Sequence, residues 1–156
     1  CMDAYMEAGT MELPTIGSQT RQRLADSLPA MANICSPEGY ADITASASVE
    51  QHVEGLRSVL DDPAVDAVIF ITVVPTFLSR KALGEALKKL LQEEGYIKKK
   101  PVYLCIMAGI YVHEVRSILE DSGIPTFDTP ADCVKTAGHI AMYQCFLQKE
   151  AVWNEA

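Results

Sequence analysis

Small hydroxyl side chains and a glycine mark three segments that follow apolar, strand-like runs. The first segment, residues 36–48, includes Ser46 and leads into a helical pattern, whose first amides could bind an anion or could simply be capped. In the second, Thr72 and Thr76 lie at a strand-to-helix turn, where Thr76 could cap the helix or contact a carboxylate or phosphate. In the third, Gly109 either lets a ligand approach the backbone closely or only forms a turn. Because open α/β sheets bind ligands beyond the carboxyl ends of their strands, these segments predict a site for a small anion.

Signatures of other chemistry are absent from the sequence. His52, His113 and His139 fall on separate predicted helices without a carboxylate or cysteine at ligand spacing, so we expect no metal site. There is no G-x-S-x-G elbow, no P-loop and no G-x-G-x-x-G after a strand, so neither a nucleophile nor NAD binding is predicted. The five cysteines include no C-x-x-C pair, and we interpret them as buried small apolar residues.

The composition is that of a single compact domain. The chain has 156 residues, of which 49% are hydrophobic and 22% charged, which is enough to bury a sizeable core. No run approaches the roughly 18 apolar residues of a membrane-spanning helix, and no signal-peptide pattern is present, so we expect a cytoplasmic protein without a membrane partner. Nucleic-acid binding requires clustered Lys and Arg, whereas the net charge is -8 and only residues 98–100 form a basic run. We therefore expect no nucleic-acid partner.

Strand-like and helix-like segments alternate along the chain. Residues 67–74 and 102–107 are apolar on both faces, as expected of central parallel strands covered by helices on both sides. Segments with a helical spacing of apolar residues lie between and after these strands. The order predicts an α/β fold, namely a three-layer α/β/α sandwich with a mostly parallel sheet and flavodoxin-like rather than Rossmann topology.

Several helix boundaries carry signals of their own. Ser48 opens a capping-box pattern, and Thr129 is followed by proline, so helices are predicted to start after both residues. Gly95 and Gly123 lie where helices are expected to stop. A further, polar helix is predicted from about residue 18 to residue 28. These boundaries support the alternation of strands and helices.

Four stretches of the sequence resemble one protein family. They are PEGYAD at residues 37–42, LDDPAVDAVIF at 60–70, KPV at 100–102 and ILEDSGIPTFDTPADCV at 118–134. They resemble the NDP-forming acyl-CoA synthetases, in particular the ADP-forming acetyl-CoA synthetases, which are relatives of succinyl-CoA synthetase. The resemblance extends over nearly the whole chain and is to the second flavodoxin-like ligase domain of these enzymes.

The resemblance implies a role as one domain of a larger enzyme. Such enzymes convert an acid, CoA and ATP to acyl-CoA, ADP and phosphate through an acyl phosphate and a phosphohistidine. The implied partners are the CoA-binding, phosphohistidine and ATP-grasp domains of the same enzyme, and a homo-oligomer is also possible. CoA, ATP or ADP and magnesium are implied for the full enzyme, none of them bound by this domain alone. The chain by itself is expected to be inactive.

The resemblance also assigns residues of the anion site. It implies that a helix beginning near Thr76 points its N-terminus toward the phosphohistidine and the acyl group, and that Asp42 is the aspartate of the family's first loop. The phosphohistidine itself is expected outside this chain, so no catalytic residue is predicted. The predicted substrate- and phosphate-binding residues are Asp42, Ser46, Thr72, Thr76 and Gly109.

One feature leaves an alternative open. The succinyl-CoA synthetase branch has Gly-Gly where this chain has Val74 and Pro75, and proline removes an amide donor from the turn. A non-catalytic, flavodoxin-like scaffolding or regulatory module is therefore the second hypothesis.

The chain is predicted to contain one domain with short extensions. Residues 1–9 have the pattern of a preceding helix that ends at Gly9. Residues 10–147 are assigned to the flavodoxin-like CoA-ligase domain and residues 148–156 to a C-terminal tail. Trp153 in this tail could contact a neighbouring domain or simply pack against its own.

Overall fold

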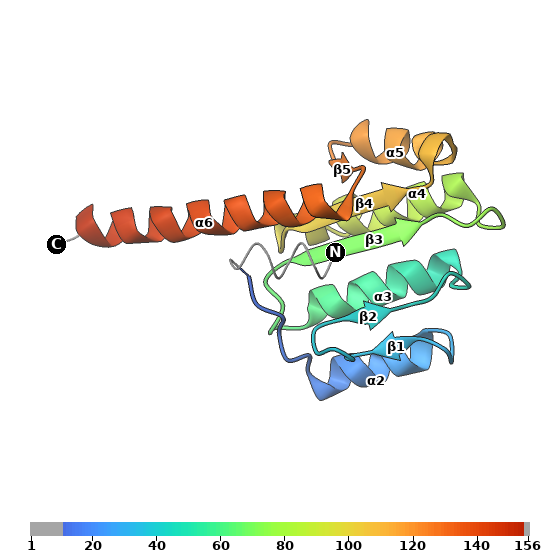
Figure 1. Cartoon of the computed structure of the whole chain (residues 1–156), viewed down its shortest axis with the longest axis horizontal. Helices are drawn as coiled ribbons and strands as arrows, with labels where there is room; N and C mark the ends of the chain where they lie inside the picture. Colours follow the sequence, from blue (N-terminus) through green and yellow to red (C-terminus); the bar gives the residue numbers. More distant parts are fainter. Residues whose placement is uncertain (1–10, 155–156) are drawn as a thin grey trace.

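A parallel sheet of three strands forms the centre of the molecule (Figure 1). The computed structural model describes residues 11–154, with side chains up to residue 148. The strand order is β3 (Val68–Val73), β4 (Val102–Met107) and β5 (Thr126–Phe127). A separate antiparallel hairpin pairs β1 (Asn33–Ile34) with β2 (Ala41–Asp42). The predicted α/β fold with a mostly parallel sheet is confirmed.

Besides the polar helix α2 (Ser18–Ser27), the described residues form seven helical segments that flank the sheet or follow it. The bounds of these segments are α3 (Val49–Asp61), α4 (Arg80–Lys88), the π-helix η1 (Lys89–Glu93), the 3₁₀ helices η2 (Tyr96–Lys98) and η3 (Gly109–Val112), α5 (His113–Glu120) and α6 (Pro130–Asn154). Helix α2 packs on α3, and α4 packs along α5.

The two faces of the sheet are covered unequally. Phe70 and Leu104 point to the larger core, which they form with apolar side chains of α3, α4 and α5. Successive strand residues point to opposite faces, so Ile71 and Cys105 lie on the other side. There they contact a small cluster that includes Cys133 from the first turn of α6. Among the described residues, both faces of the strands are thus covered, one by α3, α4 and α5 and the other by the start of α6.

The cysteines follow the predicted burial only in part. Cys105 and Cys133 are fully buried, and burial raises the pKa of the Cys133 thiol to about 12. Cys35 is half-buried, whereas Cys145 on α6 is exposed, so the prediction is wrong for Cys145. The reason is that this part of α6 has no neighbouring element within the described residues.

Most predicted helix boundaries are confirmed. The Ser48 hydroxyl accepts from the Gln51 amide at 3.2 Å, while the Gln51 side chain accepts from the Ser48 amide at 2.9 Å. Thr129 caps α6, its hydroxyl accepting from the Asp132 amide at 3.1 Å. Gly123 follows α5 with a φ of +76°, a conformation that favours glycine.

The helix after β3 starts later than predicted. Its cap is Ser79, which accepts from the Ala82 amide at 3.3 Å, and not Thr76. Between β3 and the helix, the Leu78 amide donates to the Pro75 carbonyl at 3.1 Å, which forms a turn. That turn buries the Leu78 side chain in the core, and the burial delays the helix by one turn.

The division of the chain remains a prediction. Residues 1–9, the predicted end of a preceding helix, lie outside the described residues. Helix α6 runs without interruption across the predicted boundary between residues 147 and 148. In the described part of the chain, no helix combines the length and apolar character needed to cross a membrane.

Candidate functional site

The loops after β3 and β4 leave the sheet at the same edge, which we call the carboxyl edge. The parallel register pairs Val73 with Met107, the last residues of the two strands. The Val74 amide continues the ladder by donating to the Met107 carbonyl at 3.2 Å. Thr76 and Gly109 therefore follow neighbouring strand ends, and Figure 1 shows both loops at one end of the sheet.

A buried histidine brings the first turn of α3 to this edge. His52 Nδ1 lies 2.8 Å from the Ser48 carbonyl oxygen, and its Nε2 lies 3.3 Å from the Thr72 hydroxyl. A carbonyl oxygen only accepts, so Nδ1 carries the proton and the Thr72 hydroxyl donates to Nε2. His52 and Thr72 are both buried. The bridge fixes the amino end of α3 beside the carboxyl end of β3.

The His52 bridge makes folding stability depend on pH. Burial lowers the pKa of His52 from the 6.5 of an exposed histidine, although the Ser48 carbonyl favours the protonated ring. The unfolded chain therefore binds this proton more tightly than the folded protein. Stability is complete above pH 6.5 and falls as the pH decreases below that value, by at most about 1.4 kcal/mol per pH unit.

Urea unfolding at about pH 7.5 and about pH 5.5 measures this dependence. Both pH values lie above the range in which carboxylates titrate. In His52→Gln the difference between the two pH values is expected to shrink markedly. The exposed His113→Gln variant serves as the control and is expected to keep the wild-type difference. An unchanged difference in His52→Gln would contradict the assignment.

The first predicted loop holds two of the predicted site residues together. Asp42 accepts from the Thr44 amide at 2.8 Å, and the Thr44 hydroxyl lies 2.8 Å from the Ser46 hydroxyl. Thr44 has a φ of +66°, which is uncommon for a β-branched residue, and the Asp42 bond supports that conformation. Asp42 and Ser46 are exposed. Both side chains can therefore reach a ligand.

Thr76 and Gly109 are also exposed, and apolar side chains surround them in sequence. Gly109 has a φ of +56°, which lets the chain turn from β4 into η3. Large apolar side chains in these two loops and at the end of β3 are 60% to 75% exposed; they are Val73, Phe77, Ile110 and Tyr111. The carboxyl edge thus combines exposed polar groups with an apolar surface.

Thr72 differs from the other four predicted residues. Its side chain is turned toward α3, where its hydroxyl hydrogen is engaged by His52. The Thr72 hydroxyl thus contacts the protein interior, and its bond to His52 connects β3 to α3. A direct contact between Thr72 and a ligand remains a prediction.

Helices α3 and α4, which both begin at the carboxyl edge, differ in the charge of their first turns. In the first turn of α3, Glu50 accepts from the Ser48 hydroxyl at 2.8 Å. Bonds to its own backbone amide and to Ser48 lower the Glu50 pKa, so the turn already holds a negative charge. At the start of α4, by contrast, Arg80 lies directly after the Ser79 cap. The start of α4 therefore carries a positive side chain, whereas the first turn of α3 carries a negative one.

Sequence reasoning missed Arg80. Its Nε lies 3.6 Å from a Glu114 oxygen at the start of α5, and both side chains are well exposed. An exposed pair at this distance contributes little and can open toward a ligand. The signal available in the sequence was an arginine directly after a cap serine, in a loop that follows a strand.

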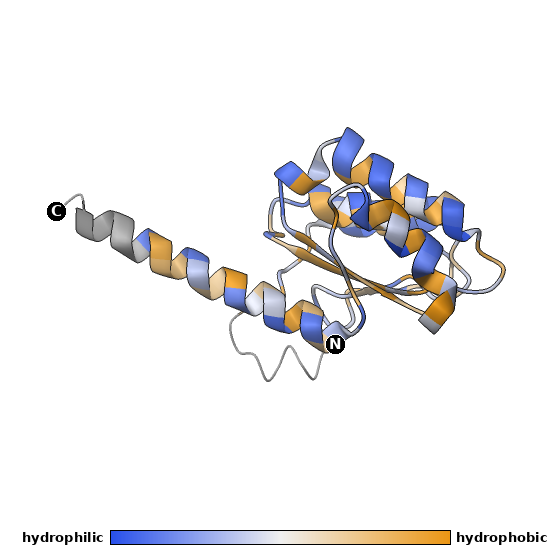
Figure 2. Ribbon diagram, turned by 90° about the horizontal axis from the view of Figure 1, so that it is seen from above, coloured by the Kyte–Doolittle hydropathy of each residue, from blue (hydrophilic) through white to orange (hydrophobic). Residues whose placement is uncertain are grey.

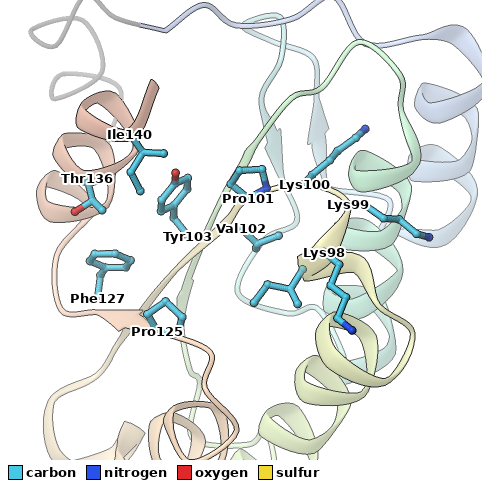
Figure 3. A pocket seen from close by; sticks show the side chains of 11 residues that line it. Lys98, Lys99, Lys100, Pro101, Val102, Tyr103, Pro125, Phe127, Thr136 and Ile140 are labelled. Carbon is cyan, nitrogen blue, oxygen red and sulfur yellow. The ribbon is translucent and has the colours of Figure 1, made fainter. Parts of the chain in front are cut away.

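A groove lies at the opposite, amino edge of the sheet (Figure 3). Its volume is about 570 Å³, and none of the predicted site residues lines it. The basic run borders it, but Lys99 lies 4.2 Å from the centre of the Tyr96 ring and Lys100 donates to the Asp62 carbonyl. The groove is therefore mainly apolar, with walls from Tyr103, Phe127 and Ile140, among others. Among residues 11–154, no three metal-binding side chains are grouped.

Comparison with known proteins connects the chain to one group of ligases. It is 32% identical over 127 residues to the alpha subunit of ADP-forming acetate–CoA ligase II from Pyrococcus furiosus, which covers 81% of this chain and 27% of that subunit. It is 31% identical over 140 residues to ADP-forming acetate–CoA ligase I from Archaeoglobus fulgidus, covering 90% of this chain and 18% of the relative. No family model matches the chain.

A solved structure supports the same relationship. The crystal structure of PH0766 from Pyrococcus horikoshii OT3 matches with a TM-score of 0.79 and 30% identity, over 90% of this chain and 31% of that one. The chain thus spans about a quarter of the length of the first relative and less of the second. With nearly its whole length matched, the chain is homologous to one part of the longer ADP-forming acetate–CoA ligases.

Proposed function

We propose that the chain acts as a domain of an NDP-forming acyl-CoA synthetase and helps to bind the phosphoryl or acyl group at its carboxyl edge. The full enzyme joins an acid and CoA, with conversion of ATP to ADP and phosphate, through an acyl phosphate and a phosphohistidine. CoA-binding, phosphohistidine and ATP-grasp domains supply the remaining parts. The domain is not catalytic alone. Its relationship to ADP-forming acetate–CoA ligases supports this proposal.

The chemistry of the carboxyl edge fits a small anion better than a nucleotide. Arg80 and the first amides of α4 provide positive charge and donors. Asp42, Ser46, Thr76 and Gly109, in the segments before α3, after β3 and after β4, add exposed polar groups. After β3, however, the chain continues with a buried valine and Pro75, and a glycine-rich loop that could surround several phosphates is missing there. CoA and ATP are therefore assigned to the partner domains.

The observation that carries the proposal is an arginine at the first turn of a helix that starts at the carboxyl edge. We expect acetyl phosphate to bind the chain with a Kd on the order of 1–10 mM, since one exposed charge and one helix end contribute little. Titration followed by NMR should shift the amides of Thr76, Arg80 and Gly109. In Arg80→Ala the affinity should fall about threefold or more.

Arg23→Ala is the matched control for this titration. Arg23 is also an exposed arginine paired with carboxylates, but it lies on α2. Its removal should leave the shifts at the carboxyl edge and the Kd unchanged. Equal binding of sulfate would indicate a general anion site. An absence of shifts at the carboxyl edge would contradict phosphoryl binding.

A non-catalytic scaffolding module is the second candidate. It is favoured by the exposed side chains of Phe77, Ile110 and Tyr111, which are suited to contact with another domain. Pro75, which cannot donate a hydrogen bond, favours it as well. This candidate predicts that the apolar carboxyl edge binds a partner domain and does not bind acetyl phosphate.

A further inference from the structure

Two cysteine thiols meet between the central strand and the last helix. Cys105 lies within β4, where it pairs with Ile71 of β3 and Phe127 of β5, and its side chain faces α6. Cys133 lies in the first turn of α6 and belongs to the same buried cluster. Both residues have an exposed fraction of 0%. The two thiols form a hydrogen bond, so sheet and helix are in contact through their sulfur atoms.

This contact belongs to a short anchored stretch of α6. In the described part of the helix, the buried residues are Cys133, Val134, Ala137 and Gly138. Beyond them α6 extends away from the body of the domain, as Figures 1 and 2 show from two directions. A covalent bond from Cys133 to β4 would therefore strengthen an attachment that otherwise depends on fewer than two helical turns.

The other described cysteines lie elsewhere in the fold. Cys35 is half-buried and lies between β1 and β2, and Cys145 lies on the exposed part of α6. Because a disulfide requires the two cysteines to lie close together, Cys105 and Cys133 are the pair that the fold prepares for one.

We propose that Cys105 and Cys133 form a redox-sensitive lock, in which a peroxide oxidises the two thiols to a disulfide that fixes α6 to β4. One thiol loses its proton and attacks the peroxide. A sulfur–oxygen bond forms, the oxygen–oxygen bond breaks, and an alcohol or water leaves. The second thiol attacks the resulting sulfenic acid, so that a sulfur–sulfur bond forms and water leaves. The two sulfur atoms together lose two electrons, which the peroxide gains, and a thiol reductant reverses the reaction.

Burial determines when the lock can close. It raises the pKa of both thiols, that of Cys133 to about 12, so both stay protonated and unreactive while α6 lies on the sheet. A peroxide reaches them when the start of α6 moves away from β4. The rate of oxidation therefore reports this movement, and the disulfide stops it.

The first test uses the chain with Cys1, Cys35 and Cys145 replaced by serine, so that only Cys105 and Cys133 remain. Hydrogen peroxide is added to the folded protein, and free thiols are then alkylated in denaturant. The expected product has lost the mass of two hydrogen atoms, resists alkylation and is restored by dithiothreitol. Peptide mapping of the wild-type chain after the same treatment should identify the same disulfide. A product that only gains oxygen atoms, a product of twice the mass, or two thiols that stay free would overturn the proposal.

A pair of glycine substitutions tests whether movement of α6 admits the peroxide. Ala137→Gly weakens the anchored stretch of α6 and should speed disulfide formation about fivefold or more, because glycine is less favourable than alanine within a helix. Ala86→Gly makes the same change in the middle of α4 and should leave the rate nearly unchanged. Equal acceleration by both substitutions would mean that the thiols react only after the whole domain unfolds, which contradicts a lock on α6.

Hydrogen exchange tests the effect of the disulfide on the helix. In the oxidised protein, the amides of residues 134–138 should exchange about tenfold more slowly than in the reduced protein, since the disulfide restricts opening of the chain that it closes. The amides of α4 serve as the control and should exchange at the same rate in both forms. Equal exchange of residues 134–138 in the two redox states would show that the disulfide does not fix α6.

Discussion

Asp62→Ala is expected to lower the free energy of unfolding by about 2 to 4 kcal/mol, since buried donors lose their acceptor. The Asp62 carboxylate is 2% exposed and accepts from the Gly17 amide at 2.8 Å and the Ala64 amide at 2.9 Å. The Thr20 hydroxyl donates to it as well. These bonds join the start of α2 to the end of α3, two elements far apart in sequence.

The same bonds determine how Asp62 responds to pH. Burial raises the pKa of the carboxyl, but the bonds from Thr20, Ala64 and Gly17 outweigh burial, and the pKa lies below the usual 3.8. The contribution of Asp62 to stability is therefore present above pH 3.8 and is lost as the pH falls through the lowered pKa.

The neighbouring Asp61 provides a matched control. Asp61 is 38% exposed and accepts from Arg23 at 3.0 Å and from the Tyr96 hydroxyl at 2.8 Å. Asp61→Ala removes partly exposed contacts and should cost about 1 kcal/mol or less. Urea denaturation of both variants gives the comparison. If both variants lose the same free energy of unfolding, the buried hydrogen bonds of Asp62 do not contribute more to stability than the exposed contacts of Asp61.

Gly84→Leu is expected to reduce the free energy of unfolding by about 3 kcal/mol, because α4 and α5 have no space for a side chain there. A Cβ atom at Gly84 lies 3.0 Å from Cδ1 and 3.3 Å from Cβ of Ile118. The helix must therefore move away from α5. Movement at this contact also widens the gap between Arg80 and Glu114, at the candidate site.

Ala82→Leu is the control on the same helix. Ala82 is exposed, so the added side chain meets solvent and stability should change by about 0.5 kcal/mol or less. Thermal unfolding compares the two variants. If Gly84→Leu is no less stable than Ala82→Leu, the close approach of α4 and α5 is not important for stability.

The elements that could be predicted from the sequence are those with local signals. The capping box at Ser48 and the stop at Gly123 depend on residues within a few positions of each other, and both are present. The apolar runs of β3 and β4 are also a local signal, since each is a continuous stretch of strand length. In such cases the local sequence and the tertiary contacts favour the same structure.

The remaining features depend on contacts between distant residues. The β1–β2 hairpin has only two residues in each strand and is closed by the Cys35 amide, which donates to the Tyr40 carbonyl at 2.7 Å. Burial of Leu78 moved the helix start from Thr76 to Ser79. The engagement of Thr72 by His52 joins residues twenty positions apart. None of these features has a short-range pattern.

The location of the candidate site could be predicted from the sequence, but the contacts between its residues could not. Parallel strands bring their carboxyl ends together, so the loops with Thr76 and Gly109 could be assigned to one edge. The pairing of Arg80 with Glu114, by contrast, depends on the packing of α4 against α5. The binding roles of Asp42, Ser46, Thr72, Thr76 and Gly109 remain predictions until a ligand is titrated.

The unequal covering of the sheet implies a hierarchy of opening within the native state. The face packed by α3, α4 and α5 holds most of the buried side chains, whereas α6 is anchored by a small cluster around Cys133 and Ala137. Segments with few buried contacts detach at a lower free energy than the whole fold. Helix α6 is therefore the element that separates first, in a partial unfolding that leaves the strands and three helices assembled.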